Sequence, residues 1–434
     1  MIKYFNGNQK NFSKKLEIIL SKRKMQYSKN SKIVNKIISD VKKFNDNAVL
    51  KYEKKFSKLK KIKTKNIKFS KSEIKKIISK LDKKTKIALN IAFNRIYKFH
   101  KKQKFSSYKI VDKFKNSISY TSSPIDRVGV YVPGGSANYP SSVLMNCIPA
   151  LIAGVKEIYM TTPALGKQCN PAVLYAAQKC KVKEIFKIGG AQAIAAFAYG
   201  TSKIKKVNKI VGPGNEYVAL AKKEVFGDVG IDMIAGPSEV TIIGDNSSNP
   251  QWIASDLIAQ AEHDKSAQSI LISNSMNLIR EVNKSLKKQL INLPKKKIAS
   301  ESLKKFGMAI YVKNQNIMAK ITNIIAPEHL EICIKKPEQF LKKISNAGSI
   351  FLGKYSAEAM GDYIIGTNHV LPTSGSAKFS SGLSVFDFLK RHSVIKISKT
   401  GIERLGTSVI NLSEYENLKG HSNSIKLRLK SKKG

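Results

Sequence analysis

The chain has 434 residues and 42% hydrophobic content, which is enough for two or three globular domains and excludes a disordered chain. Its formal net charge is +48, a balance that normally indicates a nucleic-acid or anionic-membrane partner. Almost all of this charge is Lys, scattered over residues 1–100 and 281–305, whereas bidentate contacts to phosphates and bases favour Arg. We therefore expect that the excess Lys reflects compositional drift on solvated faces and that the protein has no specific nucleic-acid partner. Nucleic-acid binding is the alternative.

The cysteines and the apolar stretches argue against zinc-ribbon, redox-motif, secreted and membrane-spanning proteins. None of the four Cys forms a C-x-x-C pair, so neither a zinc ribbon nor a redox motif is expected. The N-terminal stretch MIKYFNGNQKNFSKK lacks the apolar core of a signal peptide. The longest apolar stretch, residues 143–155, is interrupted by Asn146, Pro149 and Gly154 and is too short to span a bilayer. We predict a cytoplasmic protein without a membrane partner.

Residues 1–115 are Lys-rich and are predicted to be helical. In residues 32–56 the apolar side chains recur at three- and four-residue steps, as on amphipathic helices. The composition changes near Pro124, after which Gly, Ala and Val become more frequent.

Residues 127–240 alternate between predicted strands and helices. Each strand ends in a Gly- or Pro-rich turn before the next helix, a rhythm that predicts a parallel sheet with right-handed crossovers. The predicted strands are RVGVYVPGG, EIYMTTP, EIFKIGG and KIVGPGN, and the predicted helices are PSSVLMNCIPALIAGV, NPAVLYAAQKC and AQAIAAFAYG.

The same alternation returns after Gly236. Predicted strands are VTIIGD, SILISN, MAIYVKN and NAGSIFLG, with a helix over WIASDLIAQAEH and a later helix that leads into a turn at APEHLEI. Beyond residue 380 the sequence becomes polar and irregular, as in a tail or a small appended domain. The predicted fold class is therefore α/β, with two doubly wound units, a helical N-terminal region and a C-terminal tail.

Three stretches contain His next to other candidate ligands or bases. In AQAEHD, Gln260 and His263 share one face of a predicted helix, as metal ligands or as an ordinary helix end. In GDYIIGTNHVLPT, glycines flank Asp362 ahead of His369, as in a binding loop or a simple turn. The stretch ENLKGHSNS, with Glu416 and His421, is by itself typical of a frayed polar tail.

The stretch APEHLEI places two proton-handling side chains next to each other. Glu328 has an ordinary pKa of about 4.3 and His329 of about 6.5, so either can act as a base near neutral pH. Adjacent side chains can both face one substrate only if the backbone turns, and Pro327 favours such a break. On local grounds a pair of bases and a solvated loop remain equally open.

Short glycine turns end three of the predicted strands, at residues 134–135, 189–190 and 212–215. The G-x-G-x-x-G pattern of dinucleotide-binding enzymes is absent after the first strand. Glycine turns at strand ends can still form a nucleotide crevice, but their spacing alone is weak evidence for NAD.

Together these stretches resemble one family, histidinol dehydrogenase. The matching motifs occur in family order between about residues 125 and 421, and the first hundred residues match only loosely. The motifs are VGVYVPGG, YPSSVLMN, GGAQAIAA, VGPGN, IDMIAGPSEV, AQAEHD, PEHLEI, GDYIIGTNHVLPT, SGLSVFDFLKR and EYENLKGH.

The resemblance implies a zinc- and NAD-dependent oxidation of L-histidinol to L-histidine through L-histidinaldehyde, with a zinc ion in each subunit and NAD used twice. It implies Rossmann-like domains and an intertwined homodimer in which the tail completes the partner's site. The implied domains are an N-terminal arm (1–25), a first α/β domain (26–126 with 240–379), an NAD-binding domain (127–239) and the tail (380–434).

The resemblance also assigns roles to single residues. His329 is implied as the general base of both oxidations and Glu328 as the base that activates water. The implied metal ligands are Gln260, His263, Asp362 and His421, and they share the substrate site with Ser238, His329, His369 and Glu416. The implied NAD contacts are Tyr131, Gln192 and Asn215. A zinc hydrolase would use the same ligand types and remains an alternative, although it needs no glycine turns at strand ends.

Overall fold

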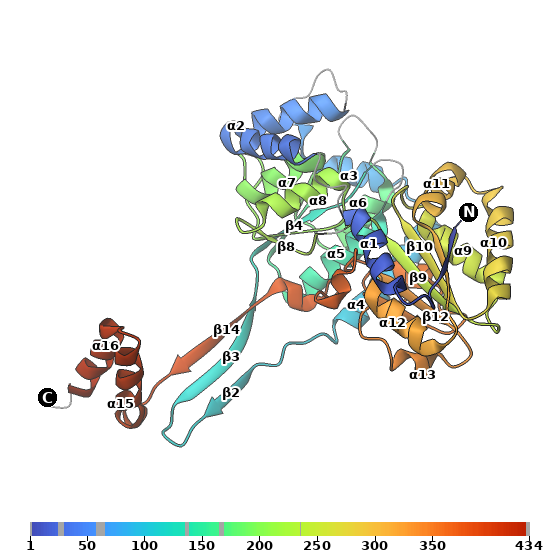
Figure 1. Ribbon diagram of the computed structural model, residues 1–434. Helices are drawn as coiled ribbons and strands as arrows, with labels where there is room; N and C mark the ends of the chain where they lie inside the picture. Colours follow the sequence, from blue (N-terminus) through green and yellow to red (C-terminus); the bar gives the residue numbers. More distant parts are fainter. Residues whose placement is uncertain are drawn as a thin grey trace. The chain divides into compact units, whose positions relative to one another are not determined.

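The computed structural model describes residues 2–24, 30–57, 66–134, 139–164, 169–234 and 236–430 (Figure 1). The chain forms two compact units, Met1–Gln103 with Asp126–Asp387, and Lys104–Ile125 with Phe388–Gly434. Across the described ranges, every helix is too short or too polar to cross a membrane.

The first unit contains a parallel sheet whose described strands number five, in the order β6-β5-β4-β7-β8. The strand order reverses between β4 and β7, which creates a switch point where parallel α/β sheets bind ligands beyond the carboxyl ends of the strands. The strands are β4 (Arg127–Tyr131), β5 (Glu157–Thr161), β6 (Glu184–Phe186), β7 (Lys209–Val211) and β8 (Gly230–Ile231).

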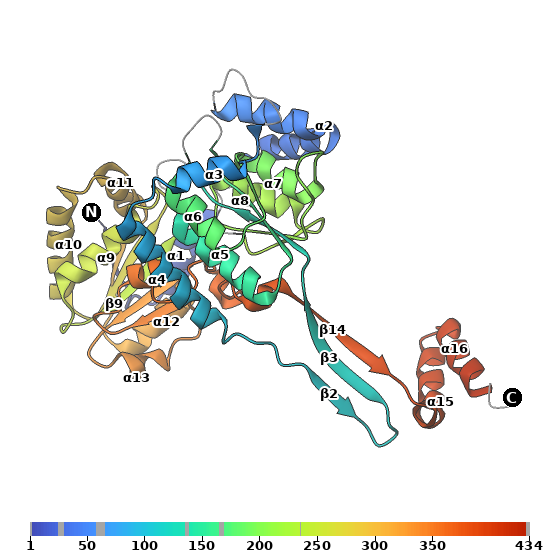
Figure 2. The same ribbon diagram turned by 180° about the vertical axis from the view of Figure 1, so that it is seen from behind.

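Helices cover both faces of this five-stranded sheet. One face packs against α7 (Gly190–Tyr199) and α8 (Glu216–Val225), and α2 (Ser31–Ser57) packs outside them in the same hydrophobic core. The opposite face packs against α5 (Pro140–Ala153) and α6 (Pro171–Lys179), as Figure 2 shows. The strand–helix alternation predicted for residues 127–240 is therefore confirmed.

The helices of residues 31–100 pack mainly on this half of the first unit. In addition to α2, α3 (Lys71–Ile78) contacts α6, and α4 (Lys83–His100) contacts α5 and α6. These contacts bring the segment next to helices of residues 127–239. Periodicity identifies an apolar helix face but not its partner, so the sequence alone does not show this packing.

A second parallel sheet of the first unit contains six described strands in the order β1-β11-β10-β9-β12-β13. Its central strands β9 and β10 are buried at every residue, as expected for parallel strands that are covered on both faces. The strands are β1 (Lys3–Asn6), β9 (Glu239–Gly244), β10 (Gln268–Ser273), β11 (Met308–Tyr311), β12 (His329–Cys333) and β13 (Ser349–Leu352).

Two hydrophobic cores cover the faces of the six-stranded sheet. One contains α9 (Pro250–Ala261), α10 (Met276–Leu290) and α11 (Lys296–Phe306). The other contains α1 (Phe12–Lys24), α12 (Gln315–Ile325) and α13 (Pro337–Leu341). Beyond β13 follow α14 (Glu358–Tyr363) and the short 3-10 helices η3 (Ser376–Lys378) and η4 (Val385–Phe388). The prediction of a second α/β unit with a parallel sheet is thus confirmed.

The purely helical prediction for residues 1–115 is wrong at both ends. Residues Lys3–Asn6 form β1, which pairs with β11 at the edge of the six-stranded sheet. Residues Tyr108–Val111 form β2 in the second unit. Both strands are four residues long, too short for the alternation of side chains to stand out from the surrounding helical pattern.

The second unit consists of an antiparallel sheet and two helices. In the described residues the sheet order is β14-β3-β2, with β2 (Tyr108–Val111), β3 (Ser117–Pro124) and β14 (Leu389–Lys396). The helices α15 (Lys399–Tyr415) and α16 (Lys419–Lys430) pack against each other. The region beyond residue 380, predicted to be irregular, therefore contains a strand and two regular helices.

Candidate active site

A cavity of about 660 Å³ lies in the first unit, lined by residues of both its sheets. The five-stranded sheet contributes the turns that follow β4 and β7, at its carboxyl edge. The six-stranded sheet contributes residues that precede β9 and begin β12, at its amino edge. Besides Asn215, seven predicted site residues line the cavity, namely Ser238, Gln260, His263, Glu328, His329, Asp362 and His369.

Glu328 and His329 stand where the chain turns from α12 into β12. Ala326 caps α12 in the left-handed conformation, with φ of 48°, and Pro327 follows. The strand then begins at His329, so the predicted turn at residues 326–332 covers only its first three residues. Both Glu328 and His329 are buried and line the cavity, which is the arrangement that a pair of bases requires.

The backbone of a single residue, Glu239 on β9, holds both side chains. Its N–H donates to Glu328 Oε2 at 2.8 Å, and its carbonyl oxygen lies 3.1 Å from His329 Nδ1. Because a carbonyl only accepts, this contact assigns the imidazole proton to Nδ1 in the neutral ring. His329 Nε2 is buried and, in the described part of the chain, has no hydrogen-bond partner, so it is the ring nitrogen that can face a substrate.

Burial and neighbouring charges shift the proton affinities of the two bases. Burial raises the pKa of Glu328 to about 7, against the opposing charge of His329. Burial lowers the pKa of His329, but the carboxylates of Glu358, Glu328 and Asp362 more than offset this and raise it well above its ordinary value. A Glu whose pKa is near neutrality is suited to general-base catalysis.

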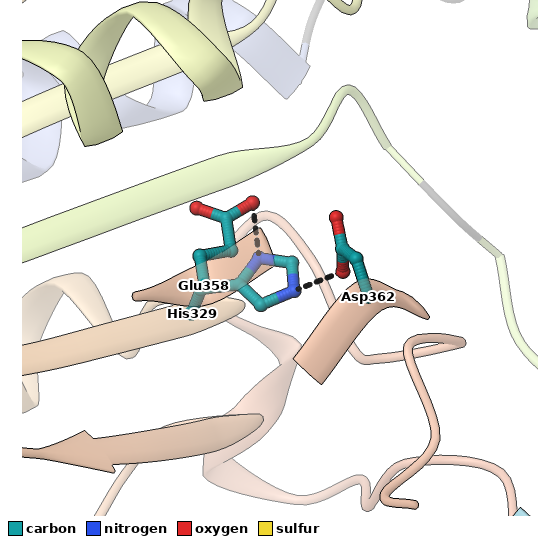
Figure 3. A group of neighbouring side chains, drawn as sticks. All are labelled: His329, Glu358 and Asp362. Carbon is teal, nitrogen blue, oxygen red and sulfur yellow. Dashed lines mark ion pairs between the residues drawn. The ribbon is translucent and has the colours of Figure 1, made fainter. Parts of the chain in front are cut away.

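Two carboxylates of α14 flank the imidazole of His329 (Figure 3). His329 Nδ1 lies 3.5 Å from Glu358 Oε1, and Nε2 lies 3.6 Å from Asp362 Oδ1. The potential ligand atoms of these three residues lie within 4.8 Å of one another, a grouping that could hold a metal ion. Burial raises the pKa of Glu358 to about 8. Asp362 is half-buried, and its contact with His329 holds the pKa of its carboxyl below the ordinary value.

The predicted ligands Gln260 and His263 come from the end of α9. Gln260 lies in its last turn, and the backbone N–H of His263, just beyond the helix, donates to Gln260 O at 3.3 Å. Gln260 is 1% exposed, and its Oε1 has no hydrogen-bond partner among the residues described. A buried amide oxygen without a partner is costly. Together with the imidazole of His263 and the Asp362 carboxylate, it forms an N/O donor set that fits zinc.

His369 is held next to this donor set. Its Nδ1 lies 2.9 Å from the backbone carbonyl of Asp362, so the neutral ring presents Nε2 as an acceptor. Desolvation lowers the pKa of His369 and, although this residue is exposed, that of His263, which favours neutral imidazoles that accept protons or bind a metal.

Two further predicted site residues, Glu416 and His421, belong to the second unit. Glu416 caps the C-terminus of α15, and His421 lies in the first turn of α16. Both side chains are exposed. The frayed tail that local sequence reasoning favoured is thus an ordered helical pair.

The predicted NAD contacts lie at the carboxyl edge of the five-stranded sheet, at the end of a strand or the start of a helix. Asn215 lines the cavity and caps α8 by accepting from the Val218 N–H at 3.2 Å. Tyr131 ends β4, and its hydroxyl accepts from the Gly190 N–H at 3.1 Å. Gln192 lies in the first turn of α7. Gly135, part of the first predicted glycine turn, falls outside the described residues.

The turn that follows β7 requires glycine and is held by a buried ion pair. Gly212 has φ of 113°, and a Cβ there would lie 2.1 Å from Tyr131 O. Its N–H donates to Asp232 Oδ2 at 2.8 Å, and its carbonyl accepts from Lys222 Nζ at 3.0 Å. Lys222 and Asp232 also pair with each other, with side chains 3% and 1% exposed. The turn is therefore fixed on both sides of its glycine.

Replacing Lys222 should strongly destabilise the protein. Lys222→Met leaves the Asp232 carboxylate buried without its cation, and loss of one partner of a buried pair costs about 3–5 kcal/mol. Urea unfolding followed by circular dichroism measures the change. Lys284→Met, which removes an exposed pair with Glu281, is the matched control and should change little. Equal unfolding midpoints for the two variants would contradict the assigned role.

Several residues of this site were not predicted. Glu358 lies outside the motifs that carry the family resemblance, and no spacing rule places it next to His329. The backbone of Glu239 leaves no signal in the sequence because any residue supplies the same N–H and C=O groups. Asp232 lies within the IDMIAGPSEV motif, so the family resemblance could have pointed to it. Lys222 is one lysine among many, and the sequence does not distinguish it.

Comparison with known proteins identifies the family. The histidinol dehydrogenase family model matches residues 20–429. The chain is 55% identical over 433 residues to the histidinol dehydrogenase of Pelagibacter ubique, with 100% of both chains covered. It is 48% identical over 400 residues to that of Clostridium acetobutylicum, covering 92% of each.

A solved structure agrees over the full length of the chain. The crystal structure of histidinol dehydrogenase from Elizabethkingia anophelis superposes with a TM-score of 0.92 at 37% identity, and the match covers 99% of this chain and 98% of that one. The likeness therefore includes both parallel sheets and the second unit. On this evidence the chain belongs to the histidinol dehydrogenase family.

Proposed function

We propose that the protein oxidises L-histidinol to L-histidine in two steps through L-histidinaldehyde, with Glu328 and His329 as its two bases. The observation that carries the proposal is their placement: both are buried in one cavity and held by the backbone of Glu239. This arrangement gives one site two distinct proton acceptors. The reaction requires them because it combines a dehydrogenation, a hydration and a second dehydrogenation. NADH formation from L-histidinol tests the activity.

His329 removes the proton of the alcohol in the first step. Its Nε2 is the free nitrogen of the ring, because Nδ1 donates to Glu239 O. Glu328 then takes a proton from the water that adds to the aldehyde, a role that its pKa of about 7 favours. During the hydration His329 returns the proton of the first step to the aldehyde oxygen, and in the last step it takes a proton from the hydrate as the second hydride leaves. Bound NAD⁺ supplies the hydride acceptor in both oxidations.

Gln260, His263 and Asp362 are the residues of the first unit that would hold zinc. The donor types and the unpartnered Gln260 oxygen support this set, and His421 of a second copy would complete it. Zinc supplies a positively charged anchor that orients the imidazole and amino groups of the substrate. Ser238 and His369 line the same cavity and would contact the substrate, and Glu416 of the second copy would do the same.

The cluster of His329, Glu358 and Asp362 offers a competing ligand set, and variants distinguish the two. Gln260→Leu should lose zinc on dialysis, with affinity lower by more than the roughly 10- to 100-fold typical of changes around a metal. Glu358→Gln should keep zinc, because its oxygens are not needed as ligands. Zinc content measured by atomic absorption distinguishes the two ligand sets. Retention by Gln260→Leu together with loss by Glu358→Gln would assign the metal to the cluster instead.

NAD is proposed to lie across the switch point of the five-stranded sheet. Three features support this placement: the order reversal between β4 and β7, the glycine that allows close approach at residue 212, and the N-terminus of α8 at the cavity. Helix N-termini with adjacent glycine turns favour the pyrophosphate of a dinucleotide. Tyr131, Gln192 and Asn215 are the proposed contacts.

The protein is further proposed to act as a homodimer whose tails complete each other's sites. The second unit exposes apolar side chains on its thin sheet and on α15, more than a small isolated unit can leave in water. These residues include Tyr108, Ile110, Ile118, Val394, Ile395, Leu412 and Tyr415. A second copy would bury them and explain why Glu416 and His421 stand in an exposed helical pair. A cytoplasmic location remains a prediction from the sequence.

A further inference from the structure

A buried carboxylate from the N-terminal helical segment contacts the turn between β6 and α7. Glu53 of α2 is 1% exposed. Its Oε1 accepts from the backbone N–H of Gly189 and from Gln192 Nε2, both at 2.8 Å. The contacts lie at the N-terminus of α7, where the helix dipole stabilises a negative charge. Glu53 therefore fixes both the backbone of the turn and the side chain of Gln192.

These contacts determine how the Gln192 amide is oriented. A carboxylate oxygen only accepts, so the amide nitrogen of Gln192 faces Glu53 and its carbonyl oxygen faces away. Gln192 is 2% exposed, and within the described ranges its Oε1 has no hydrogen-bond partner. A Cβ on Gly190 would lie 2.9 Å from this oxygen, so the oxygen lies over the glycine turn. A buried carbonyl held in this way requires a donor from outside the described residues.

The same turn is connected to the end of β4. The Gly190 N–H donates to the hydroxyl of Tyr131, and burial raises the pKa of this Tyr to about 12, which keeps it neutral. Tyr131 in turn meets the glycine turn after β7, because its carbonyl oxygen would contact any Cβ at Gly212. Glu53 is thus part of a continuous network that runs along the carboxyl edge of the five-stranded sheet.

We propose that Glu53 is a positioning residue for the dinucleotide subsite, which orients Gln192 so that its carbonyl oxygen accepts a hydrogen bond from a hydroxyl or amino group of NAD. The inference rests on the proposed placement of NAD at this edge. It gives the N-terminal helical segment, where the family motifs are weakest, a role in cofactor binding. The alternative is a purely structural role, in which Glu53 only caps α7 and stabilises the fold.

Steady-state kinetics of Glu53→Ala and Glu53→Gln separate these roles. Glu53→Ala should raise the KM for NAD by about tenfold or more, because Gln192 loses a charge-assisted hydrogen bond and is free to rotate. The KM for L-histidinol should stay close to the wild-type value. Glu53→Gln retains a carbonyl acceptor and should recover most of the NAD affinity. Gln192→Leu should resemble Glu53→Ala, and combining the two should add little further loss.

Asp46→Ala is the matched control. Asp46 lies on the same helix, is also buried, and accepts from the Ser202 hydroxyl beyond the C-terminus of α7. Its replacement should lower the thermal midpoint without changing the KM for NAD. A Glu53→Ala enzyme that is destabilised but has an unchanged KM for NAD would overturn the proposal. A wild-type protein that binds NADH in a fluorescence titration yet forms none from L-histidinol would instead contradict the proposed function.

Discussion

His329→Asn should form NADH about 10²–10⁴-fold more slowly than the wild type, with little change in the KM for L-histidinol. Asn can still donate to Glu239 O from the position of Nδ1, so the start of β12 should keep its structure. What it lacks is a group at the position of Nε2, the base proposed for both oxidations. Stopped-flow absorbance should therefore show both hydride transfers slowed.

Glu328→Gln is the informative comparison because it keeps the shape and the acceptor for the Glu239 N–H. Its amide cannot take a proton from water, so the first oxidation should proceed while the second is slowed. A burst of about one NADH per site should be followed by a slow phase, and added L-histidinaldehyde should give little NADH. Equal slowing of both steps by the two variants would contradict separate roles for the bases.

A heterodimer of two inactive variants should recover about half of the wild-type activity if the tails are exchanged. One subunit would carry His329→Asn and the other His421→Asn, and purification with two different tags isolates the mixed species. Exchange combines one intact cavity with one intact tail, whereas each homodimer has no complete site. If each tail served its own subunit, the mixed dimer would stay inactive.

The reciprocal heterodimer provides the control. A wild-type subunit paired with a His329→Asn/His421→Asn subunit should be inactive under exchange, because the intact cavity then meets the defective tail and the defective cavity meets the intact tail. Without exchange it should keep about half of the activity. The two mixed dimers therefore give opposite results under the two arrangements, and similar activities in both would contradict a shared site.

The sequence predicted the alternating strands and helices of the two parallel sheets, because each of these elements has a strong local pattern. Strands such as β9 and β10 have apolar centres and are buried along their whole length, and turns with glycine or proline separate them from helices. Short strands at sheet edges, such as β1 and β2, were missed because their pairing partners are distant in sequence. The partner of an amphipathic helix such as α2 is likewise set by tertiary packing.

In the candidate site, too, some residues could be predicted from the sequence and others could not. Residues within distinctive motifs, such as Glu328, His329 and Asp362, were identified by the family resemblance, and they line one cavity. Residues that act through geometry were not predictable. Glu53 is separated from Gln192 by 139 residues, and nothing in its local sequence distinguishes it from other acidic positions on amphipathic helices. Only the folded chain brings the carboxylate and the amide together.

The central claim is that one site oxidises L-histidinol twice with the help of a bound metal. The most direct test is the amount of NADH formed per L-histidine by the purified protein, before and after chelation. The account predicts about two NADH per histidine, loss of activity on chelation and recovery with zinc. Absence of NADH formation by a folded, zinc-loaded protein, or full activity after complete removal of the metal, would contradict it.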